Sequence, residues 1–275
     1  MNNNKYTIAQ ILPALNTGGV ERGVVEISKA LVDNNFRSIV ISSGGYMVSQ
    51  ITRQGGIHYN LDVQTKNPLK WPKIRGELKK ILENEKVDLI HFCSRAPAWI
   101  GVPLGDVLDI PIITSVHMRF RKANIFKQYY NSILTKGNFI IAISKHIEES
   151  IKTSFPKVSS KIKIIHRGVD LDLFNLSKIN PARIIAQSKH LNLKDNVPVI
   201  IMAARPAMWK GYQVLIKALS KVKHDFQCVF IGAGDGNQKF QNILINKIIK
   251  LKLETKIKLI QSTRDIQAAM ILGDL

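Results

Sequence analysis

Two cations lie five residues apart in a segment that could bind a diphosphate. Arg205 and Lys210 belong to the stretch 203–212, between a predicted strand and a predicted helix. Arginine offers a planar fork of N–H donors and lysine a mobile point charge, so the two together could hold one diphosphate. The alternative is a solvated loop that carries two unrelated cations.

Two glycine-rich junctions between a strand and a helix could bring a phosphate close to the backbone. Gly18 and Gly19 follow the first predicted strand, and Gly232 and Gly234 follow a later one in the order Gly-Ala-Gly-Asp-Gly. Glycine permits close backbone approach, and the next helix supplies free N–H groups and a positive dipole end. At 18–19, a tight turn without a ligand is equally compatible. The GxGxxG pattern is absent, which disfavours a nicotinamide dinucleotide.

His117 directly follows the predicted strand 111–116. Open α/β sheets bind ligands at the carboxyl ends of their strands, which favours a functional role over a purely structural one. His91 ends the preceding strand, where packing at the strand tip is a sufficient explanation. The remaining histidines lack the spacing of metal ligands, so no metal site is predicted. These histidines are His58, His146, His166, His190 and His224.

A long stretch without carboxylates lies between Asp109 and Glu148. Its cations are Arg119, Arg121, Lys122, Lys127, Lys136 and Lys145. Within it, an apolar helical stripe is formed by Ile125, Phe126, Tyr129, Tyr130, Ile133 and Leu134. Such a pattern is typical of a helix that lies on an anionic membrane, here the inner surface of the cytoplasmic membrane. An ordinary helix packed on the sheet is the alternative.

The elements that position these residues alternate between short apolar runs and amphipathic segments, which predicts an α/β fold with parallel sheets. Strands are expected near 6–13, 37–42, 57–61, 88–93, 111–116, 138–143 and 161–165. The alternation lapses after Asp170, where Pro181 can open a short helix. We therefore expect a first domain at 1–175 and a second at 176–275.

The second domain should contain three strands and three helices after the connecting segment. They are predicted at 197–203, 210–223, 226–231, 236–251, 256–261 and 264–272. Stable parallel layers usually have about five or six strands. The second sheet is therefore expected to be incomplete, because another strand should start near Gly273.

The chain has 275 residues and a strong excess of positive charge, with 40 Lys and Arg against 20 Asp and Glu, or +20. This favours an anionic partner: nucleic acid, a membrane surface or a phosphorylated substrate. No nucleic-acid motif is present, which disfavours the first. Cys93 and Cys228 lie in apolar runs typical of buried, reduced thiols, and no segment reads as a secretory signal or a membrane span. A cytoplasmic protein is predicted.

Several motifs together resemble glycosyltransferase family 4, whose members are retaining enzymes with two Rossmann-like domains, the GT-B fold. They are Gly-Gly-Val-Glu-Arg at 18–22, His117, Ala-Ile-Ser at 142–144, His-Arg-Gly-Val-Asp at 166–170 with Phe174, Arg205 with Lys210-Gly211, and Gly-Ala-Gly at 232–234. The segments 94–99 and 205–219 further resemble bacterial members of lipopolysaccharide core assembly.

The resemblance implies a role for each matching position. Gly18 and Gly19 would lie near the donor diphosphate and the acceptor, and His117 would face the sugar. Arg205 and Lys210 would bind the diphosphate and stabilise it as it leaves. The nucleotide pocket would include Gly232 and Gly234. No metal or other cofactor is implied, because the cations stabilise the leaving group.

The resemblance therefore implies transfer of a sugar, with retention, from a UDP- or GDP-linked donor to an anionic lipid-linked or lipopolysaccharide-type acceptor. Family members continue beyond the position of Leu275 into a loop with two glutamates that engage the donor. A truncated chain is therefore expected. A non-catalytic fragment of a split or degraded transferase, acting as a binding module, is the alternative.

Overall fold

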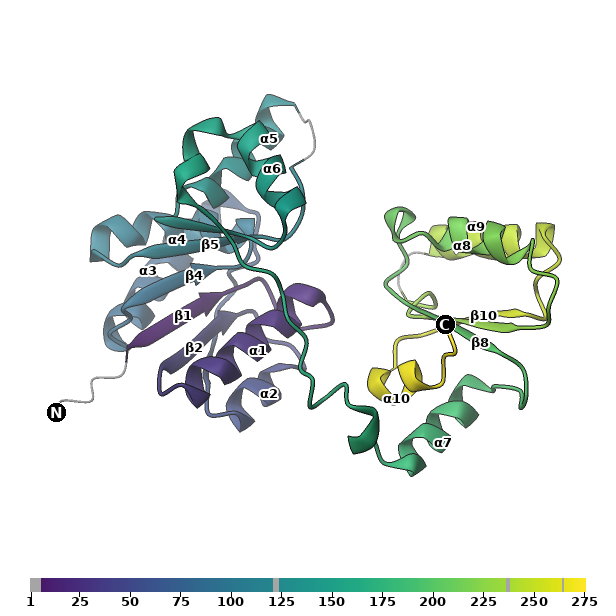
Figure 1. The fold of residues 1–275 in the computed structure, drawn as a ribbon. Coiled ribbons are helices and arrows are strands. Elements are labelled where there is room, and N and C mark those ends of the chain that lie inside the picture. Colours follow the sequence, from purple (N-terminus) through teal and green to yellow (C-terminus); the bar gives the residue numbers. More distant parts are fainter. Residues whose placement is uncertain (1–5, 121–123, 236–237, 264) are drawn as a thin grey trace. The chain divides into compact units, whose positions relative to one another are not determined.

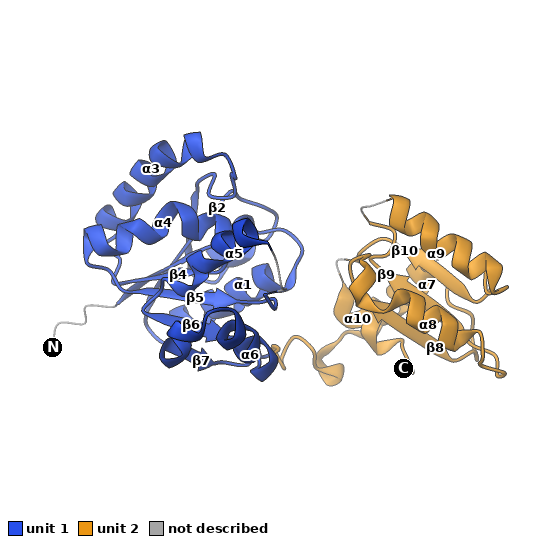
Figure 2. Cartoon of the chain, turned by 90° about the horizontal axis from the view of Figure 1, so that it is seen from above, with its two compact units in different colours: residues 1–168 blue, residues 169–275 orange. Residues whose placement is uncertain are grey.

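The computed structural model describes residues 6–120, 124–235, 238–263 and 265–275. It divides into two compact units, residues 1–168 and 169–275, which Figure 2 shows in different colours. The sequence predicted a boundary between residues 175 and 176. Each unit is built on a parallel sheet with helices on its faces, so the predicted α/β fold class is confirmed.

Within the described residues, unit 1 has a seven-stranded parallel sheet in the order β3-β2-β1-β4-β5-β6-β7. Its strands are β1 (Thr7–Ile11), β2 (Arg37–Ser42), β3 (Ile57–Asn60), β4 (Leu89–Phe92), β5 (Ile112–Val116), β6 (Phe139–Ala142) and β7 (Ile162–Ile164). All of them lie at predicted positions. The strand order reverses between β1 and β4, and such a reversal opens a crevice at the carboxyl ends of the two strands.

Helices cover both faces of this sheet (Figure 1). One face carries α1 (Gly19–Asp33) and α2 (Val48–Arg53). The other face carries α3 (Trp71–Asn84), α4 (Arg95–Leu108), α5 (Ile125–Ser132) and α6 (Lys145–Ser154). Short 3-10 helices are η1 (Pro68–Lys70), η2 (Ile133–Thr135) and η3 (Pro156–Lys161).

The core of unit 1 has two apolar layers, because strand side chains alternate between the faces of a sheet. The larger layer packs Ile90 and Phe92 of β4 against α3 and α4, with Leu78 and Leu104 fully or almost fully buried. The smaller layer lies beneath α1 and α2 and contains Val24. These layers hold the strand ends, and the loops that follow them, in fixed positions.

Two asparagines mark the end of helix α1. Asn34 is its C-cap, and Asn35 has a backbone φ of +63°, in the left-handed region. Asparagine adopts that region more readily than most residues, because its short polar side chain bonds locally. The side-chain amide of the preceding residue, Asn34, donates a 2.8 Å hydrogen bond to the carbonyl of Ala30.

Unit 2 has, among its described residues, a parallel sheet in the order β10-β9-β8. Its elements are η4 (Leu176–Lys178), α7 (Pro181–Leu191), β8 (Val199–Ala203), η5 (Met208–Lys210), α8 (Tyr212–Leu219), β9 (Gln227–Ile231), α9 (Gln238–Lys250), β10 (Ile257–Ile260) and α10 (Ile266–Ile271). Helices α8 and α9 cover one face, and α7 and α10 the other (Figure 1).

Residues 274–275 run along the edge strand β8. Asp274 N donates to Val199 O at 2.8 Å, and Ile201 N donates to Leu275 O at 2.9 Å. The backbone of this segment therefore begins to extend the sheet beside β8. The incompleteness of the second domain remains a prediction.

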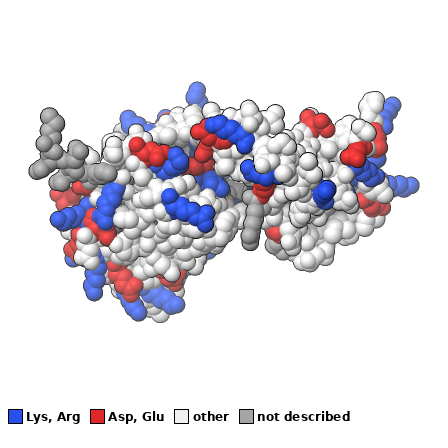
Figure 3. Space-filling view, turned by 90° about the horizontal axis from the view of Figure 1, so that it is seen from below, with Lys and Arg blue, Asp and Glu red and all other residues white. Residues whose placement is uncertain are grey.

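The positive charge is dispersed over the surface in view in Figure 3. Lysine and arginine side chains are interspersed there with acidic ones, and they form no continuous basic patch among the described residues on that face. Arg121 and Lys122, which belong to the predicted cationic stretch, lie outside the described residues. Cys93 and Cys228 are buried and free, as predicted. Of the helices in the described ranges, none is long and apolar enough to cross a bilayer.

Candidate active site

Arg167 lies against the first turns of α1 in unit 1. A β-carbon built on Gly23 would lie 2.3 Å from Nη2 of Arg167, and one built on Gly19 would lie 3.2 Å from Nη1. Side chains at these two positions would therefore displace the guanidinium. The chain leaving β7 thus places a cation beside the predicted Gly18-Gly19 junction, at the carboxyl edge of the sheet.

The N-terminal end of α1 has a carboxylate of its own. Gly18 is the N-cap of α1 and has an extended backbone. The carboxylate of Glu21 occupies the space beside it, because a β-carbon built on Gly18 would lie 2.1 Å from Oε2 of Glu21. A carboxylate in the first turn interacts favourably with the helix dipole. The glycines at 18–19 therefore provide close approach for Glu21 and Arg167, and a role for this junction in binding a ligand stays a prediction.

His117 follows β5, where the sequence placed it, and the structure shows that it is partly buried. Neither of its ring nitrogens has a hydrogen-bond partner among the described residues, although both atoms are buried. Burial, with a smaller contribution from the nearby positive charge of Arg167, lowers the pKa of His117 to about 4. The ring is therefore neutral at neutral pH and presents one donor and one acceptor.

Behind His117 lies a row of buried polar side chains on the α1 face of the sheet. Nε2 of His91 lies 2.7 Å from Oγ of Ser115, and Sγ of Cys93 lies 3.8 Å from the same nitrogen. Burial, with a smaller contribution from His117, lowers the pKa of His91 to about 4. Burial also raises the pKa of the Cys93 thiol to about 12, so this cysteine is not a thiolate nucleophile.

In unit 2, Arg205 and Lys210 lie on the loop between β8 and α8, and both are exposed. Neither side chain makes a hydrogen bond or an ion pair with any other described residue. Lys210 ends η5, and Gly211 after it has a φ of +87°, which turns the chain into α8. Both cations are therefore available to bind an anion.

The second predicted glycine junction packs against this loop. Gly232 has a φ of +85°, and a β-carbon on it would lie 2.9 Å from the carbonyl oxygen of Ala204. A β-carbon on Gly234 would lie 2.8 Å from the backbone of Ile260. Both glycines are thus required for close backbone contact between the loops after β8, β9 and β10. The next glycine, Gly236, lies outside the described residues.

Tyr212 anchors the loop between β8 and α8, which carries Arg205 and Lys210. Its hydroxyl donates to the carbonyl of Ala204, and its ring is fully buried against Phe230. Burial raises the pKa of Tyr212 to about 12, with a smaller contribution from Asp235. The carboxylate of Asp235 in turn accepts a 2.9 Å hydrogen bond from Ser262 N. The loop therefore starts from a rigid, hydrogen-bonded base.

The pair Asp170 and Asp172 has the spacing of an Asp-x-Asp metal clamp, but its carboxylates act within a turn. Oδ1 of Asp170 accepts hydrogen bonds from Asp172 N at 2.9 Å and from Leu173 N at 3.0 Å. The side chain of Asp172 forms an ion pair with Lys178. Both carboxylates therefore stabilise this turn and its surroundings.

The structure thus places the predicted residues in two sets. Gly18, Gly19 and His117 belong to unit 1, where Arg167 contacts the glycine junction and acts electrostatically on the histidine. In unit 2, the loop carrying Arg205 and Lys210 is contacted at its base by Gly232. The sequence analysis included Arg167 only as part of the motif at 166–170 and assigned it no role. The spacing of Gly19 and Gly23, one helical turn apart, was a signal that another group approaches α1 closely.

Family models match both units of the chain. The model described as Glycosyltransferase Family 4 matches residues 17–173, and that described as Glycosyl transferases group 1 matches residues 184–271. Spore coat protein SA of Bacillus subtilis (strain 168) is 25% identical over 222 residues, which cover 78% of this chain and 56% of that protein. The chain therefore spans little more than half the length of this curated relative.

Solved structures resemble the chain over almost its whole length. A glycosyltransferase from Rickettsia africae ESF-5 is 34% identical with a TM-score of 0.84, covering 98% of this chain and 72% of that one. Alr3699/HepE of Anabaena, solved with UDP and glucose, is 19% identical with a TM-score of 0.82 and the same coverage. WaaG, a glycosyltransferase involved in lipopolysaccharide biosynthesis, is 12% identical with a TM-score of 0.70, covering 98% of this chain and 73% of that one. Together with the family models, these likenesses show that the chain belongs to glycosyltransferase family 4 and has the GT-B type of architecture.

Proposed function

We propose that the protein transfers a sugar, with retention, from a nucleotide diphosphate sugar to a lipid-linked or lipopolysaccharide-type saccharide. The observation that carries this proposal is the pair Arg205 and Lys210. Both cations are exposed on one loop, without partners among the described residues, and that loop rests on the glycine junction at 232–234. Two free cations on a rigid base are suited to a diphosphate.

The chemistry of sugar transfer needs such cations. When the bond between sugar and diphosphate breaks, positive charge develops on the sugar ring and negative charge on the leaving diphosphate. Preorganised cations stabilise this charge more in the transition state than in the ground state. Arg205 and Lys210 would supply this stabilisation, so the proposed reaction uses no metal ion or other cofactor.

His117 would contact the transferred sugar. Its ring is neutral, because burial and Arg167 hold its pKa at about 4, and both of its nitrogens are free of partners in the described part of the chain. A neutral imidazole can donate one hydrogen bond to a sugar hydroxyl and accept another. It would also add no positive charge next to a sugar that is itself becoming positive.

The donor and acceptor are proposed from relatives of the same fold. Alr3699/HepE was solved with UDP-glucose, which favours a uridine nucleotide over a guanosine nucleotide as donor. WaaG and the lipopolysaccharide outer core galactosyltransferase WaaB favour a saccharide of the bacterial envelope as acceptor.

The surface of α5 suits peripheral binding to an anionic membrane at the cytoplasmic face. Ile125, Phe126 and Tyr129 are 76%, 80% and 66% exposed, although each is large and apolar or aromatic. Lys127 lies among them. Exposed apolar side chains beside cations insert into the interface of an anionic bilayer.

Vesicle co-sedimentation tests this membrane proposal. Phe126→Asp should lower the affinity for phosphatidylglycerol vesicles by about tenfold or more, since it removes the burial of one large apolar side chain. Val214→Asp is the matched control, because Val214 is 73% exposed but lies on α8 of unit 2. Binding that is indifferent to anionic lipid content, or equal losses in both variants, would contradict membrane docking by α5.

Calorimetric titration with UDP and with GDP tests the proposed donor site. Arg205→Ala and Lys210→Ala should each weaken binding of the preferred nucleotide by about tenfold or more, since each removes charged hydrogen bonds to the diphosphate. Lys217→Ala, an exposed lysine in the last turn of α8, is the control and should bind like the unmodified protein. The donor site is wrong if neither nucleotide binds, or if all three variants bind equally.

A binding module without catalysis is the second candidate function. The same two free cations, Arg205 and Lys210, would also suit this function, since they can bind a diphosphate whether or not a sugar is then transferred. Transfer of labelled sugar from the bound nucleotide sugar to an envelope glycolipid extract separates the two. Tight nucleotide binding with no transfer under any condition would favour the module over the enzyme.

A further inference from the structure

Arg95 is a second cation at the carboxyl edge of the sheet in unit 1. It is the first residue of α4, which directly follows β4, beside the point where the strand order reverses. Its Nε is buried and has no hydrogen-bond partner within the described residues. It also makes no ion pair with any of them. The site described above makes no use of this guanidinium.

The surroundings of Arg95 are aromatic instead of acidic. Its guanidinium carbon lies 5.7 Å from the centre of the Phe120 ring, and its charge acts on the phenol of Tyr130. Burial lowers the pKa of Arg95, which reflects the cost of taking its charge out of water. The segment that supplies Phe120 and Tyr130 lies between Asp109 and Glu148, where the sequence has no carboxylate. A cation–π contact compensates this cost only in part.

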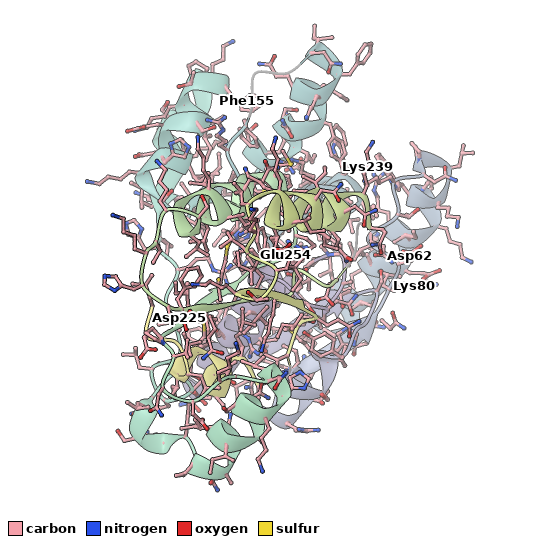
Figure 4. All side chains as sticks on the ribbon, turned by 90° about the vertical axis from the view of Figure 1, so that its right-hand side faces the viewer. Asp62, Lys80, Phe155, Asp225, Lys239 and Glu254 are labelled. Atoms are coloured by element: carbon pink, nitrogen blue, oxygen red, sulfur yellow. The ribbon has the colours of Figure 1, made fainter. Side chains whose placement is uncertain are left out.

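The neighbours of Arg95 are held firmly in place. Phe155, labelled in Figure 4, packs edge-on against Phe120 with ring centres 5.4 Å apart. Trp99, one helical turn after Arg95, stacks on Tyr130, and its Nε1 donates a 3.1 Å hydrogen bond to the Tyr130 carbonyl. Polar groups fixed in this way bind a ligand with little loss of side-chain entropy.

Tyr130 is suited to act together with Arg95. Burial raises the pKa of Tyr130, while the charge of Arg95 opposes this shift. The phenol is therefore neutral at neutral pH and can donate a hydrogen bond. The guanidinium of Arg95 and the phenol of Tyr130 are both partly open to solvent, and neither has a carboxylate partner in the described ranges. Together they suit an anionic group on an organic molecule that packs on aromatic rings.

We propose that Arg95, assisted by Tyr130, binds an anionic substituent, a phosphate or a carboxylate, on the acceptor saccharide. This inference rests on the proposed transferase function, in which Arg205 and Lys210 serve the donor diphosphate. Arg95 lies on the α4 side of the sheet, opposite the α1 face that carries His91 and Arg167. The acceptor anion and the histidine site would therefore lie on opposite faces of the sheet, both at the carboxyl ends of its strands.

The test follows the Arg95 Nε–H signal in nitrogen-edited NMR spectra of the whole protein. The signal is assigned as the one that disappears in Arg95→Lys. The probes are glucose 6-phosphate, glucuronate, inorganic phosphate and neutral glucose. We expect the first or the second to shift the signal and neutral glucose to leave it unchanged. A stronger response to glucose 6-phosphate identifies a phosphate, and a stronger response to glucuronate identifies a carboxylate.

Variants establish that Arg95 itself binds the anion. Arg95→Gln should weaken binding of the responding saccharide by about tenfold or more, since a charged hydrogen bond is lost. Arg119→Gln removes an exposed cation from the segment that supplies Phe120 and Tyr130. It should change the affinity for the saccharide by less than about twofold. Arg95→Lys, which keeps the charge but not the planar fork, should give an intermediate loss.

Three results would overturn the proposal. They are a silent Arg95 signal with both anionic sugars, equal saccharide binding by Arg95→Gln and the unmodified protein, and inorganic phosphate binding as tightly as glucose 6-phosphate. Titration with UDP separates this inference from the proposed function. If Arg95→Gln loses UDP binding, then Arg95 belongs to the donor site and the acceptor proposal fails alone. If the unmodified protein does not bind UDP, the donor proposal fails while the Arg95 response to saccharides is still measured.

Discussion

Lowering the pH from about 7.5 to about 5 should destabilise unit 1 through its two buried histidines. His91 and His117 both have a pKa of about 4 in the folded chain, against an ordinary value of 6.5. Between these values the unfolded chain binds more protons than the folded one, so the free energy of unfolding falls as the pH falls. At about pH 5 the loss is about 2 kcal/mol for each histidine, and the pair loses less than twice that amount because part of the His91 shift comes from His117.

Other titratable groups contribute little to the pH dependence of the unfolding free energy near pH 5. Burial also lowers the pKa of His58, which acts in the same direction. The pKa values of Asp225 and Asp265 lie below 3.8, so their contribution to stability is lost only at lower pH. The loss near pH 5 therefore belongs to the histidines of unit 1.

Urea unfolding at the two pH values measures the effect. Tryptophan fluorescence reports mainly on unit 1, because Trp71 and Trp99 are half-buried there, whereas Trp209 of unit 2 is 67% exposed. The double variant His91→Gln and His117→Gln cannot bind these protons, so its unfolding free energy should depend much less on pH. His146→Gln, an exposed change on α6, is the control. Equal pH dependence in the double variant and the unmodified protein would refute the assignment of neutral, buried histidines.

Two glycine substitutions test the close contacts of the site. Gly23→Ala should displace Arg167 and raise the pKa of His117 toward its ordinary value, which an NMR titration of the histidine ring measures; an unchanged pKa would contradict the electrostatic contact. Gly232→Ala should destabilise unit 2 by about 1–3 kcal/mol in urea unfolding, because of its positive φ and its contact with Ala204 O. An unchanged unfolding midpoint would show that the two loops do not need this close approach.

The arrangement of strands and helices could be predicted from the sequence because it depends on local pattern. Parallel strands are buried on both faces and appear as short apolar runs, such as the run that forms β2 (Arg37–Ser42). Helix α7 begins at Pro181, as predicted, because proline fits the first turn of a helix. Strand ends also follow from this pattern, which is why His117 could be placed at the edge of the sheet.

The partners of the site residues could not be predicted, because they come from distant parts of the chain. Arg167 packs against α1 at Gly23, and Arg95 packs against Phe120. In both pairs the two residues are far apart in the sequence. Such contacts depend on the strand order, which a single sequence does not reveal. The shifted pKa of His117 depends on burial and on Arg167, so it too requires the folded structure.

A crystal structure of the protein with UDP would locate the donor site. We expect the diphosphate to lie within hydrogen-bonding distance of the side chains of Arg205 and Lys210, next to the backbone of Gly232. A diphosphate bound elsewhere, with both cations directed into solvent, would contradict this expectation.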